Sequence, residues 1–348
     1  MHMADALLTP AVAATMYVAS GAAAGLSIHA LRKDDDPQKL PTMAVTAALV
    51  FAGQMINYTI PGTGSSGHMC GGMLLSALLG PQAGFLSMIV ILTIQCLFFA
   101  DGGLMALGAN VWNMAFYGCF AGYSLLWRPI QRGRLFGDGP RGERGRIVAA
   151  SVLGCVVTLQ LGAFSVVLET TLSGITELPF GAFLALMQPI HLAIGLVEGL
   201  ITAAVLVFVH SSRPELLRDV AAGGSGKRSF PATVAVLAAI AVFAGGGLSL
   251  AASSNPDGLE WALFGNAEAG YAENMGLDEE GFGVSSGAAE AAASIQERTA
   301  LLPDYSFANG DSPAGTSVSG IAGSAMVAGI VILLCLAGGF FRRRRAGK

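Results

Sequence analysis

Eight stretches of this sequence are long and apolar enough to cross a lipid bilayer as helices. They cover residues 8–31, 42–60, 82–100, 104–127, 147–170, 183–209, 231–252 and 319–341. A membrane-spanning helix needs about 20 predominantly apolar residues. Charged residues make up only 12% of the chain, whereas soluble domains have about 25%. A membrane protein has few charged residues because a charge in the hydrocarbon region is costly. The sequence therefore predicts an all-α, polytopic membrane protein.

The basic residues predict on which side of the membrane each connection lies. They gather in segments 32–39, 128–146, 213–228 and 342–345. Basic connections face the cytoplasm in most membrane proteins, and all four do so together only if the short apolar stretch 66–79 also crosses. We therefore expect nine crossings, with Met1 outside and the carboxyl terminus inside. The acidic segment 253–318 then lies outside.

Composition divides the chain into three parts. Residues 1–210 are expected to form a unit of seven helices with short connections. Residues 211–230 are rich in glycine, serine and charge, which is typical of a cytoplasmic linker. Residues 231–348 hold two further transmembrane helices, and the Gly-, Ala- and Glu-rich loop between them is predicted to be a poorly ordered, solvated tether.

The linker contains one string, AAGGSGKRS at 221–229, that resembles a phosphate-binding loop. The GxxxxGK[ST] pattern requires glycine where Ala221 stands and serine or threonine where Arg228 stands. The string fails both tests. We therefore expect no ATP hydrolysis in this chain, so any ATPase must be another polypeptide.

His2 is the second residue of the chain, and no basic region typical of a cleavable signal precedes the first apolar stretch. A side chain this large predicts that Met1 is retained with a free amine. That amine, the backbone nitrogen of His2 and its imidazole form fused chelate rings around one ion. Nitrogen-only planar coordination suits Ni²⁺ or Cu²⁺. The alternative is an exposed terminal histidine that binds nothing.

A second histidine, His68, lies in the glycine-rich string PGTGSSGHMCGGM. Glycines permit tight turns, and Ser65 and Ser66 are predicted to cap the helix that follows. Irregular backbone at membrane depth is tolerated where it lines an enclosed cavity. The expected topology places this loop on the same side as Met1. A metal site shared by His2 and His68 is therefore a hypothesis that the residues alone leave open.

Four polar residues lie inside predicted crossings. His191 and Glu198 are seven residues apart and therefore share one helix face. Asn110 and Asn113 lie one helical turn apart. Ionisable groups within a span are functional candidates, and we consider all four as residues that surround a ligand site. The alternative is that they form buried hydrogen bonds between helices.

Several of these strings together resemble one known family. MHMADALLTP, GTGSSGHMCGGMLLSALLGP, FADGGLMALGANVWNMAFYG and HLAIGLVEGLITA resemble the CbiM/NikM family, over roughly residues 1–210. Its members are the substrate-specific components of energy-coupling-factor (ECF) transporters for cobalt and nickel. SSNPDGLEW, with Pro256 to Glu260, resembles the PDGLE segment of the small partner protein of that family, here fused to the carboxyl terminus.

The resemblance implies a metal bound by the amine of Met1, the amide and imidazole of His2, and His68. It implies a membrane coupling subunit and two cytoplasmic ATPases as partners, in the cytoplasmic membrane of a bacterium or archaeon. It implies no cofactor beyond the transported nickel or cobalt ion and no nucleic acid. Many cobalt-type members have histidine where this chain has Asp101, which favours nickel.

Small residues at positions 44, 48 and 52 follow the small-xxx-small spacing that lets helices approach closely. The resemblance implies that Ala44, Ala48 and Ala52 contact a partner subunit, and packing within the chain is the alternative.

Two other functions fit a helical membrane protein. A serine hydrolase built on Ser65 or Ser66 is disfavoured because no GxSxG elbow is present. A stand-alone secondary metal transporter or channel is the main alternative. Such proteins typically contain internal repeats with interrupted helices in matched positions, and this sequence contains one short helix and no evident repeat.

Overall fold

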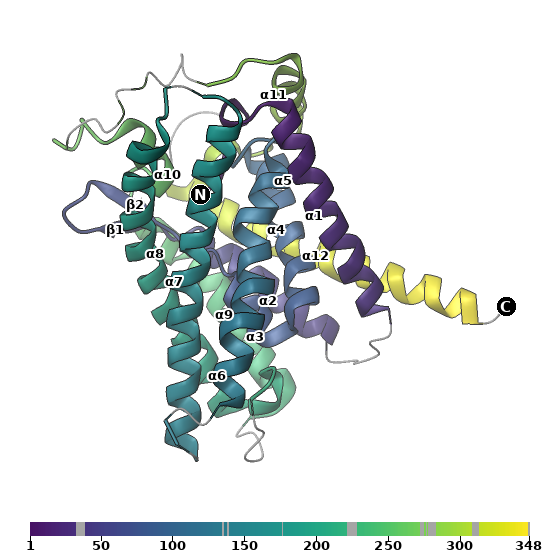
Figure 1. Ribbon diagram of the computed structural model, residues 1–348. Coiled ribbons are helices and arrows are strands. Elements are labelled where there is room, and N and C mark those ends of the chain that lie inside the picture. Colours follow the sequence, from purple (N-terminus) through teal and green to yellow (C-terminus); the bar gives the residue numbers. More distant parts are fainter. Residues whose placement is uncertain are drawn as a thin grey trace.

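Helices dominate the structure, a computed structural model (Figure 1). It describes residues 1–32, 39–133, 136–137, 139–175, 177–220, 228–271, 275, 277, 283–307 and 313–346. The helices of the amino-terminal part are α1 (Pro10–Leu31), α2 (Lys39–Gln54), α3 (Gly72–Leu79), α4 (Pro81–Phe99), α5 (Leu107–Asn110), the π-helical segment η2 (Val111–Trp127), α6 (Arg128–Arg132), α7 (Pro140–Leu172) and α8 (Phe180–Ser212). The carboxyl-terminal part has α9 (Phe230–Gly246), α10 (Gly258–Phe264), α11 (Gly287–Thr299) and α12 (Pro313–Ala346). Strands β1 (Tyr58–Ile60) and β2 (Ser65–Gly67) pair as an antiparallel hairpin.

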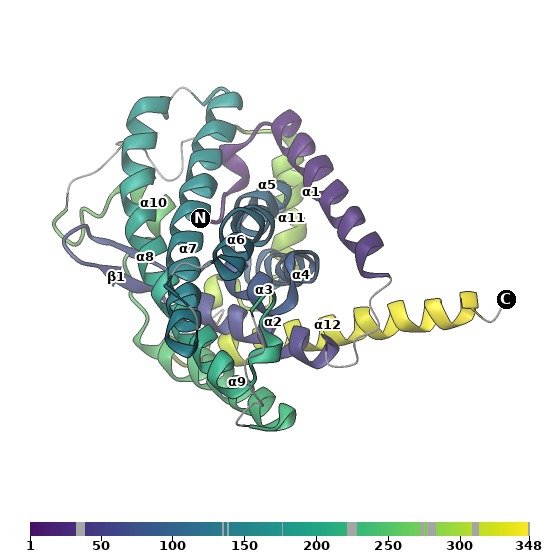
Figure 2. The same cartoon turned by 60° about the horizontal axis from the view of Figure 1, so that its bottom comes forward.

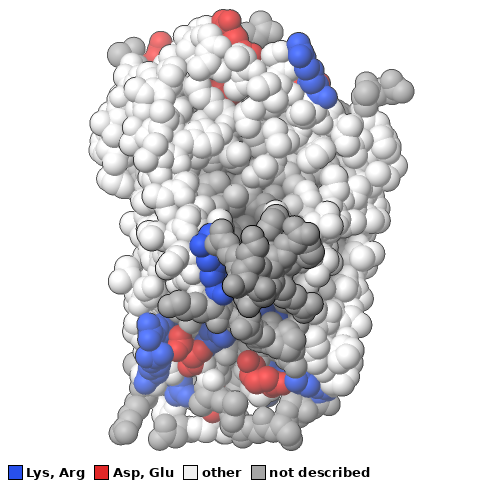
Figure 3. All heavy atoms as spheres, turned by 90° about the vertical axis from the view of Figure 1, so that its right-hand side faces the viewer, with Lys and Arg blue, Asp and Glu red and all other residues white. Residues whose placement is uncertain are grey.

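The structure confirms a helical, multi-pass membrane protein. Within the described residues, six helices are long and apolar enough to cross a bilayer: Pro10–Leu31, Pro81–Phe99, Pro140–Leu172, Phe180–Ser212, Phe230–Ala251 and Ala314–Ala337. Charged side chains on the face in Figure 3 gather mainly toward the two ends, with a largely uncharged surface between them. This distribution agrees with a chain whose middle is surrounded by lipid.

The expected count of nine crossings is not confirmed. Helix α2 has 16 residues and α3 has 8, which are both shorter than a span requires. The stretch predicted at 42–60 ends as a helix at Gln54, and 66–79 becomes helical only at Gly72. The hairpin occupies the intervening residues, and most of α2 and all of α3 are buried inside the bundle.

The two longest helices of the amino-terminal part, α7 and α8, run side by side (Figures 1 and 2). Glycines of α8 allow this contact. A Cβ atom added at Gly195 would lie 2.9 Å from Cα of Val156, and one at Gly199 would lie 2.6 Å from Cα of Val152. Side chains at these two positions would force the helices apart. The glycines therefore set the distance between α7 and α8, the helix that bears His191 and Glu198.

The carboxyl-terminal helices α9 and α12 pack against α2 and join the same bundle. The hydroxyl of Ser324 in α12 donates a hydrogen bond of 3.3 Å to the carbonyl of Ala48. Ala44, Ala48 and Ala52 are all buried within the chain. Their small side chains therefore pack inside this chain, which favours the alternative of packing within the chain over contact with a separate subunit.

The described residues of segment 253–318 do not form a solvated tether, so that prediction was wrong. The amide of Ser253 donates to the carbonyl of Asn57, and the amide of Val284 donates to the carbonyl of Ala6, each at 2.8 Å. Capping and hydrogen bonds to the bundle hold these described residues in place, and composition does not report such contacts.

The described part of the linker also docks on the bundle. The amide of Arg218 donates to the carbonyl of Ala77 at 2.8 Å, and Asp219 accepts hydrogen bonds from Arg132 and Tyr123. Residues 221–227, which contain most of the glycine-rich string, lie outside the described residues.

Candidate metal centre

The amino terminus enters the bundle and is held there by Asn110. The backbone N–H of Met3 donates to Oδ1 of Asn110 at 2.7 Å, and Nδ2 of Asn110 donates to the carbonyl of Met3 at 3.2 Å. The amide of Gly103 donates to the same carbonyl. Met3 is fully buried. These bonds therefore fix the depth of Met1 and His2 inside the helical bundle. Asn110 therefore holds the amino-terminal segment in place by hydrogen bonds.

Asn113 lies one turn further along and contacts the same segment. Its amide nitrogen donates to Oε2 of Glu169 at 2.8 Å and lies 3.6 Å from the sulfur of Met3. It thus ties the terminal segment to α7 without approaching the histidines directly.

The hairpin β1–β2 places His68. Its turn contains Gly62 and Gly64, whose φ angles are 78° and 74°, a conformation that favours glycine. His68 follows β2 directly. The ring nitrogen Nδ1 of His68 lies 3.1 Å from the carbonyl oxygen of Met69. A carbonyl only accepts, so Nδ1 bears the proton and Nε2 keeps its lone pair.

Ser65 and Ser66 do not cap α3, so that prediction was wrong. They form β2, and the residue before α3 is Gly71. Both serines are buried, and the hydroxyl of Ser66 donates to the carbonyl of Asn255 at 2.7 Å. They therefore attach the hairpin to the carboxyl-terminal segment.

His191 and Glu198 share a face of α8 but do not bond to each other. The two carboxylate oxygens of Glu198 accept the backbone N–H groups of Cys70 and Gly71 at 2.7 and 2.9 Å. Glu198 therefore holds the loop that follows His68. Nδ1 of His191 lies 2.8 Å from the carbonyl of Met187, and its Nε2 is buried without a hydrogen-bond partner.

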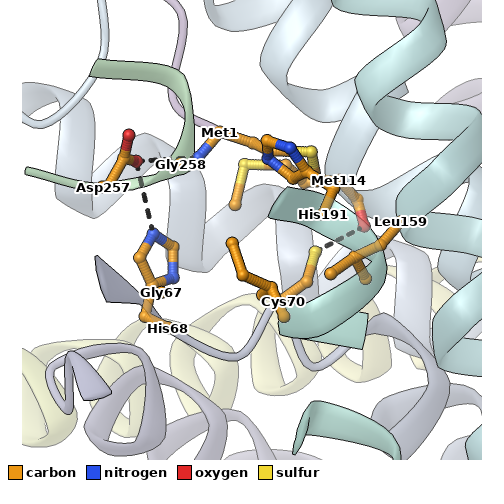
Figure 4. Close-up of a pocket in the computed structure, with 10 residues that line it drawn as sticks. Met1, Gly67, His68, Cys70, Met114, Leu159, His191, Asp257 and Gly258 are labelled. Carbon is orange, nitrogen blue, oxygen red and sulfur yellow. Dashed lines mark hydrogen bonds and ion pairs between the residues drawn. The ribbon is translucent and has the colours of Figure 1, made fainter. Parts of the chain in front are cut away.

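The predicted ligands Met1, His2 and His68 come together beside α7 and α8. The imidazoles of His2 and His68 stack with ring centroids 5.5 Å apart. The terminal amine of Met1 lies 2.9 Å from Oδ2 of Asp257, and Nε2 of His68 lies 3.9 Å from the same oxygen. Figure 4 shows the amine, His68, His191 and Asp257 around one pocket.

Both ring nitrogens of His2 face oxygen acceptors. Nδ1 lies 3.1 Å from Oδ1 of Asp101, and Nε2 lies 3.3 Å from Oε1 of Gln95. A neutral imidazole donates from only one nitrogen, so the other presents a lone pair. The hydroxyl of Tyr305 donates to the second oxygen of Asp101 at 2.5 Å, which fixes the carboxylate against the ring.

Burial sets the charge state of the site. It lowers the pKa of His68 to about 4 and also lowers the pKa of His2. Both imidazoles are therefore neutral near pH 7, the form that binds metals. Burial alone would raise the pKa of Asp257, but the terminal ammonium and His68 hold it well below its usual range. Asp257 is thus a carboxylate paired with the ammonium.

Within the described residues, no three His, Cys, Asp or Glu side chains stand together as a ligand set. Met1, whose terminal amine is a further nitrogen group, lines the same pocket as His68.

Sequence reasoning missed two residues of this cluster, Asp257 and Gln95. Asp257 lies in the recognised PDGLE string, but its local pattern indicates only a helix cap. No signal in the sequence indicated that a segment some 250 positions from Met1 would reach the terminal amine. Gln95 lies in the apolar helix α4, and nothing in its sequence context distinguishes it from a polar residue that only packs between helices.

Comparisons with known proteins agree with this fold. The profile of the cobalt uptake substrate-specific transmembrane region, CbiM, matches residues 2–216, and the PDGLE domain matches residues 231–339. A protein of Archaeoglobus fulgidus described as a putative fused nickel transport protein NikMN is 38% identical over 330 residues, which cover 94% of this chain and 95% of that protein. A fused nickel transport protein NikMN of Rhodobacter capsulatus is 30% identical over 353 residues, which cover 95% and 96% of the two chains.

A solved structure described as a transition metal transporter has a TM-score of 0.52 and 30% identity, and the match covers 60% of this chain and 92% of that one. A multi-pass helical bundle that encloses two histidines and its own amino terminus thus has the architecture of a membrane transporter for metal ions. The chain belongs to the CbiM family of cobalt and nickel transport proteins and includes a PDGLE domain.

Proposed function

We propose that this chain is the substrate-binding membrane subunit of an ECF-type importer and that it captures Ni²⁺ or Co²⁺, with nickel favoured. The observation that supports this most is the buried terminal amine beside the stacked rings of His2 and His68. Four nitrogens would hold the ion: the amine of Met1, the amide and Nδ1 of His2, and Nε2 of His68.

This nitrogen set would supply selectivity. Mg²⁺ and Ca²⁺ bind oxygen ligands, whereas Ni²⁺ accepts a planar nitrogen set. Two fused chelate rings require the amine, amide and imidazole of one residue pair, so they form only at the terminus. In the structure, Asp101 contacts the imidazole of His2 and Asp257 contacts the amine of Met1. Metal binding would exchange these contacts for bonds to the ion.

The charge of the site is conserved in this exchange. The amine loses one proton from its ammonium form, and the amide of His2 loses another. Both protons pass to solvent as an ion of charge +2 enters. The ammonium carries a charge of +1 before binding, and the metal with its deprotonated ligands carries +1 afterwards. The buried pocket therefore gains no charge.

Energy for transport would come from partners. The glycine-rich linker string does not match a phosphate-binding loop, and the family resemblance implies two cytoplasmic ATPases and a membrane coupling subunit. The alternative is a stand-alone secondary transporter or channel, in which uptake needs no ATPase.

The test combines metal binding with uptake. We expect His2→Ala and His68→Ala each to remove binding of one nickel ion per chain and to abolish uptake, because each deletes a ligand. His29→Ala, at an exposed histidine at the end of α1, is the matched control and should bind as the unaltered chain does. Uptake should require the coupling subunit and the ATPases. Equal uptake without them would favour the secondary transporter, and metal binding by both histidine variants would overturn the proposed site.

We also expect metal affinity to rise steeply with pH between pH 6 and pH 8. The pKa of His68 is about 4 and that of His2 is also lowered, so protons do not compete for the imidazoles in this range. The protons on the amine and amide do compete, and each proton displaced lowers Kd by about tenfold per pH unit. Log Kd, from calorimetric titration, should fall by about one to two per pH unit. A flat profile would show that the amine and the amide are not ligands.

A further inference from the structure

Asp257 bears two independent contacts, one on each carboxylate oxygen. Oδ1 accepts the backbone N–H groups of Leu259 and Glu260 at 2.8 and 2.9 Å, which caps α10. Oδ2 points the other way, to the amine of Met1 at 2.9 Å and toward Nε2 of His68 at 3.9 Å (Figure 4). The helix therefore fixes the orientation of the oxygen that faces the proposed ligands.

The position of Asp257 is set by contacts other than those with the amine. The amide of Ser66 donates to the carbonyl of Pro256 at 2.8 Å, and the indole of Trp261 donates to the carbonyl of Thr63 at 2.8 Å. The side-chain amide of Asn266 donates to the carbonyl of Gly64, also at 2.8 Å. The hairpin that presents His68 thus also holds the PDGLE segment in place.

The next residue shows how closely this segment enters the pocket. A Cβ atom added at Gly258 would lie 3.1 Å from Cε1 and 3.4 Å from Nε2 of His191. The backbone after Asp257 therefore closes the pocket over His191. A side chain at position 258 would require small shifts of the imidazole of His191 and of Cδ1 of Ile194, which would lie 3.0 Å from the added Cβ atom.

We propose that Asp257 is the counter-charge of the metal site in both its empty and its loaded state, so that the carboxyl-terminal segment supplies part of the capture site. The inference rests on the proposed function, because it takes the amine and His68 as ligands. A buried charge without a partner is strongly unfavourable. The ammonium and the metal with its deprotonated ligands each place one net positive charge beside Oδ2.

The carboxylate would act as a positioning group that retains the terminus in the pocket before the ion arrives. After binding, it would balance the ion from beside the ligand plane. The alternative is that the carboxylate of Asp257 competes with the metal for the amine and must leave before the metal binds. The direction in which nickel affinity changes when this charge is removed distinguishes the two roles.

Asp257→Asn tests this role with little change of shape. Asparagine caps helices as well as aspartate does, so its oxygen keeps the bonds to α10, while the charge that faces the amine is lost. We expect nickel to bind about 10–100-fold more weakly, the usual cost of removing a group that supports metal ligands. Calorimetric titration measures the change. The midpoint of thermal unfolding of the metal-free chain verifies folding.

Glu260→Gln is the matched control, because it removes a charge three residues away on the same helix. Its carboxylate accepts from the backbone N–H of Asp257 at 3.2 Å, and its side chain is exposed. Affinity should stay within about twofold of the unaltered chain. Asp257→Ser, which also keeps a capping oxygen, replaces the asparagine variant if that variant does not fold.

Each outcome has one reading. Weaker binding by Asp257→Asn with unchanged binding by Glu260→Gln supports the counter-charge. Unchanged affinity of Asp257→Asn overturns it, and tighter binding shows that Asp257 competes with the metal. His2→Ala measured in parallel separates the two proposals. If His2→Ala binds like the unaltered chain, the ligand set fails, whereas a loss in His2→Ala without one in Asp257→Asn removes only the role of Asp257.

Discussion

A chain extended by even one residue before Met1 should bind nickel at least about a thousandfold more weakly, a loss of roughly 4 kcal/mol. Extension converts the terminal amine into an amide, which carries no positive charge and binds a metal only after it loses its single proton. The ion pair with Asp257 at 2.9 Å is lost with it. Space is lacking too, because Met1 is only 6% exposed and a Cβ atom at Gly162 would lie 3.2 Å from its methyl group.

A cleavable tag makes this test reversible within one preparation. The tag is placed before Met1 so that protease treatment restores the native terminus, and mass spectrometry verifies that Met1 is retained. The tagged protein should not bind nickel, and the cleaved protein should bind one ion per chain. A second preparation with the same tag at the carboxyl terminus controls for the tag itself. Full binding by the uncleaved protein would rule out the amine as a ligand.

The sequence predicted the fold class because the signal for membrane helices is one of composition. Runs such as 82–100 and 183–209 are apolar over their whole length, and α4 and α8 follow them closely. The short elements were less predictable. Residues 55–67 are rich in Gly, Ser and Thr, and their hairpin depends on glycines with positive φ and on contacts with residues 253–266.

The candidate ligands were predictable because their chemistry is local. Met1 and His2 are neighbours in sequence, and His68 stands out as a histidine in a glycine-rich loop. Asp257 was not predictable from its own surroundings, because its pairing with Met1 spans most of the chain. The same reason explains the wrong expectation for segment 253–318. A polar composition reports the lack of an independent core, but it does not report hydrogen bonds to a bundle that already exists.

Glu198→Gln should destabilise the fold by about 1–3 kcal/mol, the cost of one buried donor left unpaired. In the structure, each oxygen of Glu198 accepts one N–H group, from Cys70 and from Gly71. Glutamine offers one oxygen and one NH₂ group, so it satisfies only one of the two donors. The other N–H group loses its partner, and the loop that follows His68 is released on that side.

The same change should weaken nickel binding by about tenfold or more, because groups that orient metal ligands have effects of this size. His68 precedes Cys70 by two residues, so movement of the loop moves its Nε2 relative to the amine of Met1. Thermal unfolding in detergent and calorimetric titration measure the two effects on the same samples. Glu143→Gln is a matched control, because Glu143 pairs with His210 at 3.2 Å and contacts neither the loop nor the ligands.

The relation between the two effects tests how the site is built. A conserved affinity in a destabilised Glu198→Gln protein would mean that the hairpin and the PDGLE segment position His68 without α8. A loss of both stability and nickel affinity would mean that α8 sets the geometry of the loop that follows His68. Since α8 is also the helix most closely packed on α7, a movement of this pair would then reach His68 directly through Glu198. Such a link would connect a change in the bundle to the release of the ion.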